Sequence, residues 1–433
     1  MDILTSNDRV GQYPASYYAA TADLPAPFDH ARGALTCDIC VVGSGFTGLS
    51  AVIHLAKAGY DVILLDAHRV GFGASGRNGG QVGTGQRVEQ DALEKLVGKD
   101  AAHALWNLSL QSVQLVRDLI AKHDMGCEFV DGIIHADHRA RLVPENHAYA
   151  EKLRRDYGYD LARPINKEEM RDLVGSPAYH GGVLDMGGGH IHPLRFALGL
   201  AKIAADNGVR IFERSKVTDI AQTSPTTVTT EQASITASHV VLACNGYLGR
   251  LHSKVAARVM PINNFIVATE PLDEDTATSL IRDNHAVADS KFVINYFRLS
   301  EDRRMLFGGG ESYGYRFPRD IAALVRKPML DIYPQLRNTR IDYAWGGTLG
   351  ITMNRMPHFT RLQGNILSAS GYSGHGVGMA TLGGKIAAQA IMGQAEKFDL
   401  MANVPTQRFP GGIALRWPLL VLAMLWFSLR DKL

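Results

Sequence analysis

Three glycine-rich stretches hold the residues whose types and spacing point to chemistry. The first, from Gly43 to Gly48, reads Gly-Ser-Gly-Phe-Thr-Gly and matches the G-x-G-x-x-G pattern. In this pattern the first glycine permits a tight turn, the second lets the backbone approach a pyrophosphate, and the third lets a helix pack against a strand. The N–H groups and positive dipole end of that helix then face the phosphates. The residues predicted to bind them are Gly43, Ser44, Gly45, Phe46, Thr47 and Gly48.

The segments around this motif predict a strand, turn, helix, strand unit. Residues 39–42 are apolar and rich in β-branched side chains, and apolar residues at helical spacing follow Gly48. A second apolar strand at 62–65 ends in Asp66, about 20 residues after the glycines, where a ribose-binding carboxylate belongs. The alternative is an ordinary βαβ unit. The order of strand, turn, helix, strand and acid favours a dinucleotide site.

The other two glycine-rich stretches indicate a long ligand. Residues 70–85 read VGFGASGRNGGQVGTG, which would let the backbone approach a large ligand at many points. A flexible surface loop is the alternative, but Arg77 and Asn78 add hydrogen-bonding groups that make it less attractive. Residues 371–378 read GYSGHGVG between a predicted strand at 366–369 and a predicted helix. A ligand that touches both helix N-termini must be long, and FAD is such a ligand.

Composition and charge narrow the class of protein. The 433 residues predict two domains, and 46% hydrophobic with 20% charged residues is ordinary for a folded chain. A net charge of +2 without a long basic run gives no indication of nucleic acid binding. The pair Cys37 and Cys40 lacks a second Cys or His set, so we interpret both as structural thiols and predict no metal. No signal peptide is recognisable, and a cytoplasmic location is the expectation.

The C-terminal segment is unusually apolar. Residues 417–429 read WPLLVLAMLWFSL, which is shorter than the about 20 residues that a bilayer-spanning helix needs. Docking on the protein's own surface is the first hypothesis. A peripheral membrane contact through 413–429, which would place the protein at the cytoplasmic face of a membrane, and an oligomer contact are the alternatives.

Several motifs together carry a family resemblance. They are Tyr13–Tyr18, Val41–Leu49, Gly71–Gln81, Gly371–Val377 and Phe409–Gly412. On these motifs nearly the whole chain resembles the FAD-dependent amine and D-amino-acid oxidase (DAO) family, and within it most strongly the gamma-glutamylputrescine oxidase-like proteins. GASGRNGGQ and GYSGHGV are much more specific than the first glycine motif.

The resemblance implies an α/β plus α+β fold. A Rossmann-like domain would bind FAD, and a mostly antiparallel sheet domain would cover the flavin and form the substrate pocket, as in the glutathione-reductase-2 type of architecture. The expected segments of the FAD-binding domain are 1–125, 180–255 and 340–405. The expected segments of the substrate domain are 126–179 and 256–339, and the apolar tail is 406–433.

The resemblance also assigns FAD-binding roles residue by residue. Asp66 would bind the AMP ribose, Val217 the adenine, and Gly43 to Gly48 the pyrophosphate. Ser75 to Gly80 would run beside the pyrophosphate, ribityl chain and flavin ring. The N–H groups of His375, Gly376 and Val377 would face the N1/C2=O edge of the flavin and stabilise negative charge there. The predicted cofactor-binding set is completed by Ala67, Gly73, Ala74, Ser75, Gly76, Arg77, Asn78, Gly79, Gly80, Ala243, Asn245, Gly246 and Gly374.

The implied reaction is oxidation of a C–N bond in a small amine or amino acid, with hydride transfer from the α-carbon to flavin N5 and hydrolysis of the imine. The catalytic candidates are His192, Trp345, Tyr372 and His375. His192 and its neighbour His190 could instead cap a helix, and Trp345 could be a core residue. Arg298 or Arg355 could bind a substrate carboxylate.

Two departures from family patterns bear on the chemistry. The segment 303–307 lacks the lysine that sarcosine oxidase-type relatives place by the flavin, which puts fast reduction of oxygen in doubt. No cysteine follows Cys244, so non-covalent FAD is expected. Three functions stay open: an oxidase that uses oxygen, a quinone-linked dehydrogenase at the membrane surface, and a non-catalytic FAD-binding protein. The oligomeric state is unknown.

Overall fold

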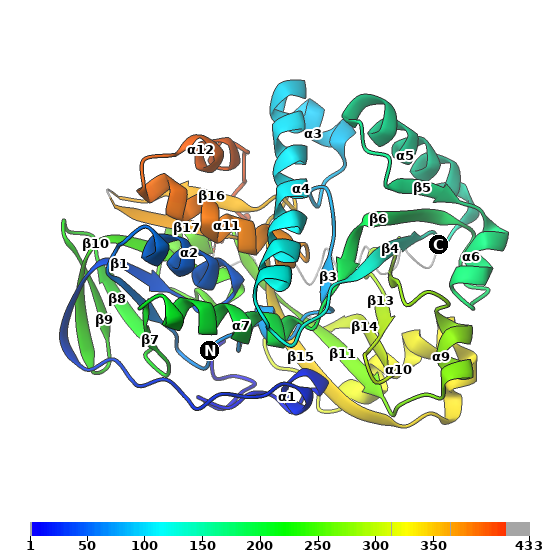
Figure 1. Cartoon of the computed structure of the whole chain (residues 1–433), viewed down its shortest axis with the longest axis horizontal. Coiled ribbons are helices and arrows are strands. Elements are labelled where there is room, and N and C mark those ends of the chain that lie inside the picture. The colour runs from blue at the N-terminus through cyan, green and yellow to red at the C-terminus, as the bar shows by residue number, and fades with distance from the viewer. Residues whose placement is uncertain (1, 313, 364, 413–433) are drawn as a thin grey trace.

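Two large β-sheets, each with its own helices, make up the two halves of the molecule (Figure 1). The computed structural model describes residues 2–312, 314–363 and 365–412. The predicted fold class is confirmed, because one sheet is largely parallel with helices packed on it and the other is mostly antiparallel. The helices are α1 (Tyr17–Thr21), α2 (Phe46–Lys57), α3 (Gln90–Val97), α4 (Lys99–Lys122), α5 (Val143–Tyr157), α6 (Lys167–Leu173), α7 (Pro193–Asp206), α8 (Ser253–Ala256), α9 (Glu274–Leu280), α10 (Ile321–Ile332), α11 (Gly376–Ile391) and α12 (Glu396–Ala402).

The first sheet has eight strands in the order β16-β17-β10-β1-β2-β7, and a hairpin of β8 and β9 joins it at β10. Its strands are β1 (Gly33–Val42), β2 (Val62–Leu65), β7 (Arg210–Phe212), β8 (Val217–Ala221), β9 (Thr226–Thr230), β10 (Ala233–Leu242), β16 (His358–Arg361) and β17 (Ile366–Ser370). The apolar end of β1 lies between β2 and β10, both parallel to it, which is why these residues are buried on both faces. Helices α2, α7 and α11 pack together beside this sheet.

The second sheet has nine strands in the order β15-β11-β14-β13-β12-β4-β6-β3, with β5 paired to β6. Its strands are β3 (Gln81–Val82), β4 (Val130–Ala136), β5 (Ala162–Ile165), β6 (Gly182–His190), β11 (Met260–Thr269), β12 (Ala286–Asp289), β13 (Tyr296–Leu299), β14 (Met305–Ser312) and β15 (Ile341–Ile351). All neighbours are antiparallel except β4 and β12. Helix α10 packs against β11, β14 and β15.

Strand β6 contains three consecutive glycines. A run of glycines favours a turn, but Gly187, Gly188 and Gly189 lie inside a strand. Neighbouring side chains leave no room for larger residues here. A Cβ at Gly187 would lie 1.9 Å from the Tyr159 hydroxyl, and one at Gly189 would lie 2.2 Å from the Phe129 ring. Large side chains on adjacent segments therefore take the space that β6 leaves free.

Strand pairing places two strands in the other half of the molecule from the one predicted. The segments 180–255 and 340–405 were expected in the FAD-binding domain, yet β6 and β15 pair within the second sheet. The reason is that β15 pairs along nearly its whole length with β11, from Met260 to Thr269. The remaining boundaries stay a prediction.

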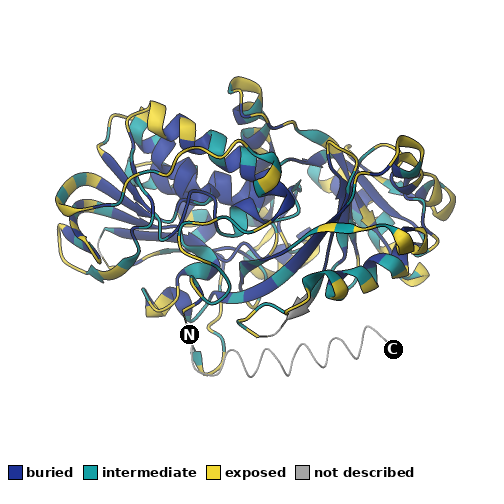
Figure 2. Cartoon of the chain, turned by 90° about the horizontal axis from the view of Figure 1, so that it is seen from below, coloured by how far each residue is buried: buried dark blue, intermediate teal, exposed yellow. Residues whose placement is uncertain are grey.

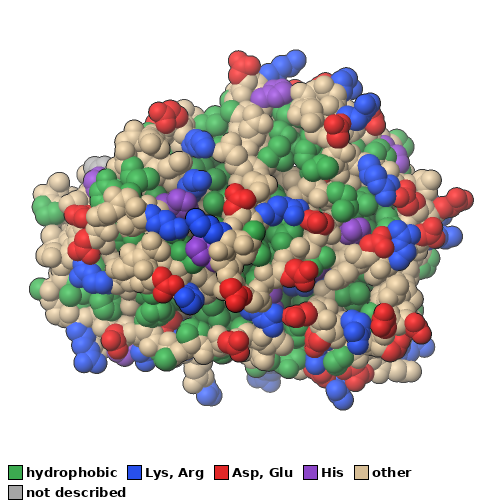
Figure 3. All heavy atoms as spheres, viewed as in Figure 1, with side chains coloured by type: hydrophobic (Ala, Val, Ile, Leu, Met, Phe, Trp, Pro, Cys, Tyr) green, Lys and Arg blue, Asp and Glu red, His purple; other side chains and the backbone are tan. Residues whose placement is uncertain are grey.

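Burial follows the sheets. In Figure 2 the strands of both halves are mostly buried, while exposed residues lie on loops and on the outer faces of helices. Separate apolar cores fill the two halves, one around α2, α7 and α11 and one around α10. On the face in Figure 3, acidic and basic side chains are interspersed, as the small net charge leads one to expect.

An N-terminal arm, residues 2–16, contacts both halves. The Asp8 carboxylate pairs with Arg77 at 3.0 Å, and Asp2 pairs with Lys216 beside β8. The Asn7 side chain donates to the Tyr315 carbonyl at 2.8 Å and accepts from the Phe317 N–H at 2.7 Å. The arm is thus held by residues from well-separated parts of the chain.

Candidate active site

A cavity of about 1550 Å³ lies between the two sheets. Residues from both halves line it, including Val42 and Leu65 from the first sheet and Ile133, Asn264 and Tyr296 from the second. Most of the residues predicted to bind the cofactor also line it. These are Gly43, Gly45, Phe46, Thr47, Asp66, Ala67, Gly73, Ala74, Ser75, Arg77, Asn78, Gly79, Val217, Ala243, Asn245, Gly246, Gly374, His375, Gly376 and Val377.

The first glycine motif forms the turn between β1 and α2. Gly43 has φ +105°, and a Cβ there would lie 2.8 Å from the Ala243 carbonyl oxygen, so the turn requires glycine. Gly45 is the N-cap of α2 and has no side chain to cap it; the Phe46 N–H donates to the Ser75 hydroxyl at 3.0 Å, and the next N–H, that of Thr47, stays available at the cavity. A Cβ at Gly48 would lie 1.8 Å from the Gly43 carbonyl oxygen, so this glycine permits packing rather than contact with a ligand.

The Asp66 carboxylate is fixed by the same turn. Its Oδ2 atom accepts from the Ser44 N–H at 2.7 Å and from the Ser44 hydroxyl at 2.6 Å, and its Oδ1 atom accepts from the His68 N–H at 2.8 Å. These bonds fill both lone pairs of Oδ2 and one of Oδ1, so Oδ1 has capacity for a further bond. Because Asp66 lines the cavity, it can accept hydrogen bonds from a bound ligand, whereas Ser44 supports it from behind.

The second glycine stretch is shaped by Arg77 and Asn78. Besides its pair with Asp8, the Arg77 guanidinium donates to the Phe72 and Gly346 carbonyls at 2.7 and 3.1 Å, and it stacks over the Phe72 ring. The Asn78 amide donates to the carbonyls of residues 74 and 75 and accepts from the Gly80 N–H. Most of these polar groups are therefore used within the protein, and the loop offers mainly its backbone to the cavity.

Four predicted cofactor-binding residues lie outside the cavity lining: Ser44, Gly48, Gly76 and Gly80. A Cβ at Gly76 would lie 2.3 Å from the Gly71 carbonyl oxygen, and one at Gly80 would lie 2.2 Å from the Ile191 carbonyl oxygen. Close packing of the backbone explains these two glycines. Their predicted direct contact with the cofactor is corrected to a supporting role.

The third glycine stretch forms the turn before α11. His375 is the N-cap residue of that helix but makes no side-chain capping bond, so the first helix N–H groups stay available beside the cavity. Burial, followed by the charges of Arg87 and His135, lowers the pKa of His375 to about 4 and keeps the imidazole neutral. Its ring packs against Gly83, where a Cβ would lie 2.7 Å from the ring.

Tyr372 lines the cavity, but its hydroxyl is engaged elsewhere. The Tyr372 and Thr47 hydroxyl oxygens are 2.7 Å apart, so this bond joins the turn before α11 to the first turn of α2. Burial raises the pKa of Tyr372, which keeps the phenol protonated. The side chain thus ties together the two helix N-termini that face the cavity.

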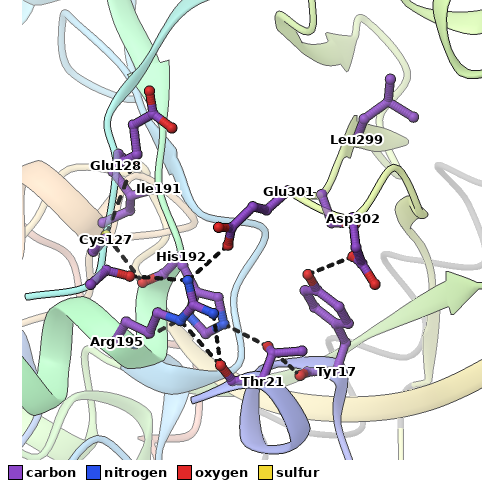
Figure 4. A network of polar contacts seen from close by, with 12 residues as sticks. Tyr17, Thr21, Cys127, Glu128, Ile191, His192, Arg195, Leu299, Glu301 and Asp302 are labelled. Atoms are coloured by element: carbon purple, nitrogen blue, oxygen red, sulfur yellow. Dashed lines mark hydrogen bonds and ion pairs between the residues drawn. The ribbon is translucent and has the colours of Figure 1, made fainter. Parts of the chain in front are cut away.

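His192 does not line the cavity, contrary to its predicted catalytic role. Figure 4 shows that its ring lies beside Thr21 and Arg195 instead. Its Nδ1 atom accepts from the Arg195 N–H at 3.2 Å and caps α7, and its Nε2 atom lies 3.0 Å from the Thr21 hydroxyl oxygen. Burial, with the charges of Arg195 and Arg298, lowers its pKa to about 3. His192 is a neutral capping residue that connects α7 to α1.

Trp345 and Arg298 likewise lie outside the cavity lining. Trp345 is buried behind the second glycine stretch, where its indole N–H donates to the Arg77 carbonyl at 3.0 Å. Arg298 donates to the carbonyls of residues 79, 191 and 299 and to the Tyr18 hydroxyl. These contacts leave Arg298 outside the cavity lining, so it is not placed to bind a substrate carboxylate. Arg355, the other candidate, does line the cavity.

Sequence reasoning missed the residues that the second sheet contributes. They are Ile133, His135, Asn264, Ala288, Asp289 and Tyr296 from β4, β11, β12 and β13. They come from separate strands, so no local motif marks them; the Tyr296 hydroxyl donates to the Asn264 side chain across that sheet. Arg87 was also missed, although it follows the second glycine stretch by two residues.

The cavity fits FAD. The available N-termini of α2 and α11, two separate elements, both face it, and each can take one charged part of a long dinucleotide. The model of the family named DAO, FAD dependent oxidoreductase, matches residues 38–390. The chain belongs to this family. It is an FAD-dependent oxidoreductase, and the glycine stretches and Asp66 are the residues that would hold the cofactor.

Two curated relatives of this oxidoreductase match it along nearly its whole length. It is 41% identical to "Gamma-glutamylputrescine oxidoreductase" of Escherichia coli over 98% of this chain and 99% of that protein. It is 40% identical to "Probable oxidoreductase OrdL" of Rhizobium meliloti, over 96% of this chain and 97% of that one. Among solved structures, glycine oxidase from Geobacillus kaustophilus has a similar fold, with a TM-score of 0.73 and 20% identity over 86% of this chain and 99% of that one.

Three remaining points concern membrane-spanning helices, the apolar tail and metal sites. Across residues 2–312, 314–363 and 365–412, no helix combines the length and apolarity needed to cross a membrane. The apolar tail at 413–433 lies outside the described residues, so its docking stays a prediction. In the described part of the chain, no group of three or more His, Cys, Asp or Glu side chains is arranged to hold a metal ion.

Proposed function

We propose that this oxidoreductase oxidises a C–N bond in gamma-glutamylputrescine or a related polyamine derivative. The similarity to a gamma-glutamylputrescine oxidoreductase over nearly all of both chains supports this substrate class. The single observation that carries the proposal is the cavity itself, which continues from the glycine stretches to the second sheet. It therefore has room for a substrate beside the cofactor, between the turn before α11 and strands β4, β11, β12 and β13.

The residues around the cavity support amine oxidation in two ways. When bound, FAD supplies the two-electron chemistry by accepting a hydride from the carbon next to the amine nitrogen. The N-terminus of α11 stabilises negative charge that develops beside it. Apolar side chains at Ile133, Phe292 and Ile294 line the same cavity, and an apolar wall lowers the pKa of an amine so that it enters the reaction neutral.

The electron acceptor is oxygen or a quinone. A quinone-linked dehydrogenase at the membrane surface is the second candidate, because the segment 303–307 contains arginines but no lysine. Arg304 is held by Asp302 and Asp342 at 2.6 Å each, so its charge is already paired. Release of peroxide in air would favour oxygen. Reduction of a soluble quinone without peroxide would favour the second candidate.

An anaerobic screen of flavin reduction tests the proposal. The purified yellow protein is mixed without oxygen with polyamines, gamma-glutamylated amines, sarcosine, glycine and D-amino acids, and bleaching of flavin absorbance is followed. We expect gamma-glutamylputrescine to bleach the flavin fastest. Bleaching by none of these amines would support a non-catalytic FAD-binding protein, and faster bleaching by glycine or D-amino acids would contradict the substrate class.

A further inference from the structure

The first turns of α2 and the helix α11 pack closely against each other beside the cavity (Figure 1). Two glycines of α11 make this contact possible. A Cβ at Gly384 would lie 2.1 Å from the Thr47 carbonyl oxygen, and a Cβ at Gly383 would lie 2.8 Å from the Tyr372 hydroxyl oxygen. The close packing brings the hydroxyl oxygens of Tyr372 and Thr47 to 2.7 Å from each other, although the two residues are 325 positions apart in the chain.

This pair of hydroxyl groups contains one more proton than its mutual bond uses. Each hydroxyl carries one proton, and the bond between Tyr372 and Thr47 takes one of the two. In the described part of the chain, neither hydroxyl forms a further hydrogen bond. Both residues line the cavity, and each is only 4% exposed. The second proton is therefore available to an acceptor that enters the cavity.

The chemistry of the two groups decides which proton stays available. A phenol is a stronger acid than an aliphatic alcohol, so the Tyr372 hydroxyl is the better donor and Thr47 accepts in their bond. Burial raises the pKa of Tyr372, so the phenol keeps the proton that it donates. A hydroxyl that accepts a hydrogen bond also becomes a better donor, because linked hydrogen bonds polarise one another. The Thr47 proton is thus the one offered to the cavity.

Thr47 presents two donors at one place. Its N–H lies in the first turn of α2 and stays available at the cavity, and its hydroxyl proton adds a second donor there. The N-terminus of a helix favours an anion. After a turn of the G-x-G-x-x-G type, the anion that belongs at this place is the pyrophosphate of a dinucleotide.

We propose that Tyr372 is a positioning residue for the cofactor: it donates to Thr47 and thereby directs the Thr47 hydroxyl proton onto an oxygen of the FAD pyrophosphate. The third glycine stretch, to which Tyr372 belongs, then serves phosphate binding at the first glycine motif as well as its own helix. The inference goes beyond the proposed function, since it concerns the cofactor and holds for any amine that is oxidised. A failure to oxidise gamma-glutamylputrescine would leave it unchanged.

The test measures how tightly the full-length protein, after removal of FAD, binds FAD and ADP, which carries a pyrophosphate without the flavin. We expect Thr47→Val, which keeps the shape of the side chain, to raise Kd for both ligands by about 10- to 100-fold, the loss of a hydrogen bond to a charged group. Tyr372→Phe should raise both Kd values by about 3- to 10-fold. The double variant should bind no more weakly than Thr47→Val alone, because Tyr372 acts through Thr47.

Two further variants serve as controls. Thr47→Ser keeps a hydroxyl group, so Kd should stay within about threefold of the wild type. Tyr333→Phe removes another buried phenol hydroxyl, which donates to the Leu280 carbonyl at 2.8 Å and does not line the cavity. It should lower the midpoint of thermal unfolding as Tyr372→Phe does, but leave both Kd values unchanged.

Three results would overturn the proposal. Unchanged Kd values in Tyr372→Phe, with a loss of stability like that of Tyr333→Phe, would show that the bond only stabilises the fold. Losses that multiply in the double variant would show that Tyr372 and Thr47 act independently. The midpoint potential of the bound flavin should not change in Tyr372→Phe; a lower potential, with weaker binding of FAD but not of ADP, would assign Tyr372 to the flavin instead of the pyrophosphate.

Discussion

The two ends of the cavity are built in different ways. The end near β2 and β8 is assembled by neighbours in sequence, since the turn at Gly43 and the acid at Asp66 belong to one short unit joined by the Ser44 bonds. The opposite end is assembled by strands from distant parts of the chain, together with Arg87 and Arg355. The first end therefore rests on local geometry that tolerates little change, whereas the opposite end rests on side chains from separate elements that can change independently.

The largest effect is expected from a substitution that crowds the turn between β1 and α2. In Gly48→Ala, the added methyl group meets the Gly43 carbonyl oxygen at 1.8 Å, and the overpacking should cost about 3 kcal/mol or more of the free energy of unfolding. Loss of FAD from the purified protein, seen as a lower ratio of flavin to protein absorbance, is the measurement. Gly59→Asn is the matched control, because that glycine ends the same helix with open space around it and asparagine tolerates its φ of +89°. Full FAD content in Gly48→Ala would show that the turn between β1 and α2 tolerates change, and would contradict this prediction.

The next largest effect is expected from breaking the buried ion pair between Asp8 of the arm and Arg77. In Asp8→Asn, the Arg77 guanidinium, which is 1% exposed, loses its carboxylate, and breaking a buried pair from one side should cost about 3 kcal/mol. Thermal unfolding of the FAD-loaded protein measures this change. Lys202→Gln on the exposed face of α7 removes a surface pair instead and should change the midpoint little. Equal midpoints for the two variants would show that the arm contributes nothing.

Asp66→Asn should weaken FAD binding without unfolding the protein. The amide keeps the shape of the side chain but loses the charge that attracts Ser44, His68 and a ribose hydroxyl, so the Kd for FAD should rise about 10- to 100-fold. Titration of the apoprotein with FAD measures it. Asp118→Asn, on the exposed part of α4, should bind FAD as the wild type does. Unchanged affinity in Asp66→Asn would place the ribose elsewhere.

The smallest effect on catalysis is expected at His192. His192→Asn keeps an acceptor at the helix cap, so kcat should stay within about twofold of the wild type. Because the folded-state pKa of His192 lies below its unfolded value, the unfolded state binds the extra proton, and stability falls as the pH drops from about 6.5 toward 3. The variant should therefore lose less stability over that range, by about 1 kcal/mol per pH unit. A large fall in kcat for His192→Asn would support the predicted catalytic role of His192 and contradict its assignment as a capping residue only.

The same contrast explains what could be predicted from sequence. The turn at Gly43, the strand at 62–65 and the position of Asp66 follow from spacing, because neighbouring residues alone decide them. Trp345 and His192 carry residue types suited to catalysis, yet long-range pairing of β15 and capping of α7 place both outside the cavity. Arg87 and Asn264 are brought to the site by the meeting of two sheets, which spacing along the chain does not reveal.

The N-terminal arm has a consequence for how the protein is assembled. Its Asp2, Ile3 and Leu4 line the cavity, and its bonds reach Lys216, Tyr315 and Phe317. The arm can therefore dock in full only after residues about three hundred positions later have been synthesised and folded. The part of the cavity wall that Asp2, Ile3 and Leu4 form is therefore completed only once the second sheet and the segment after it are in place.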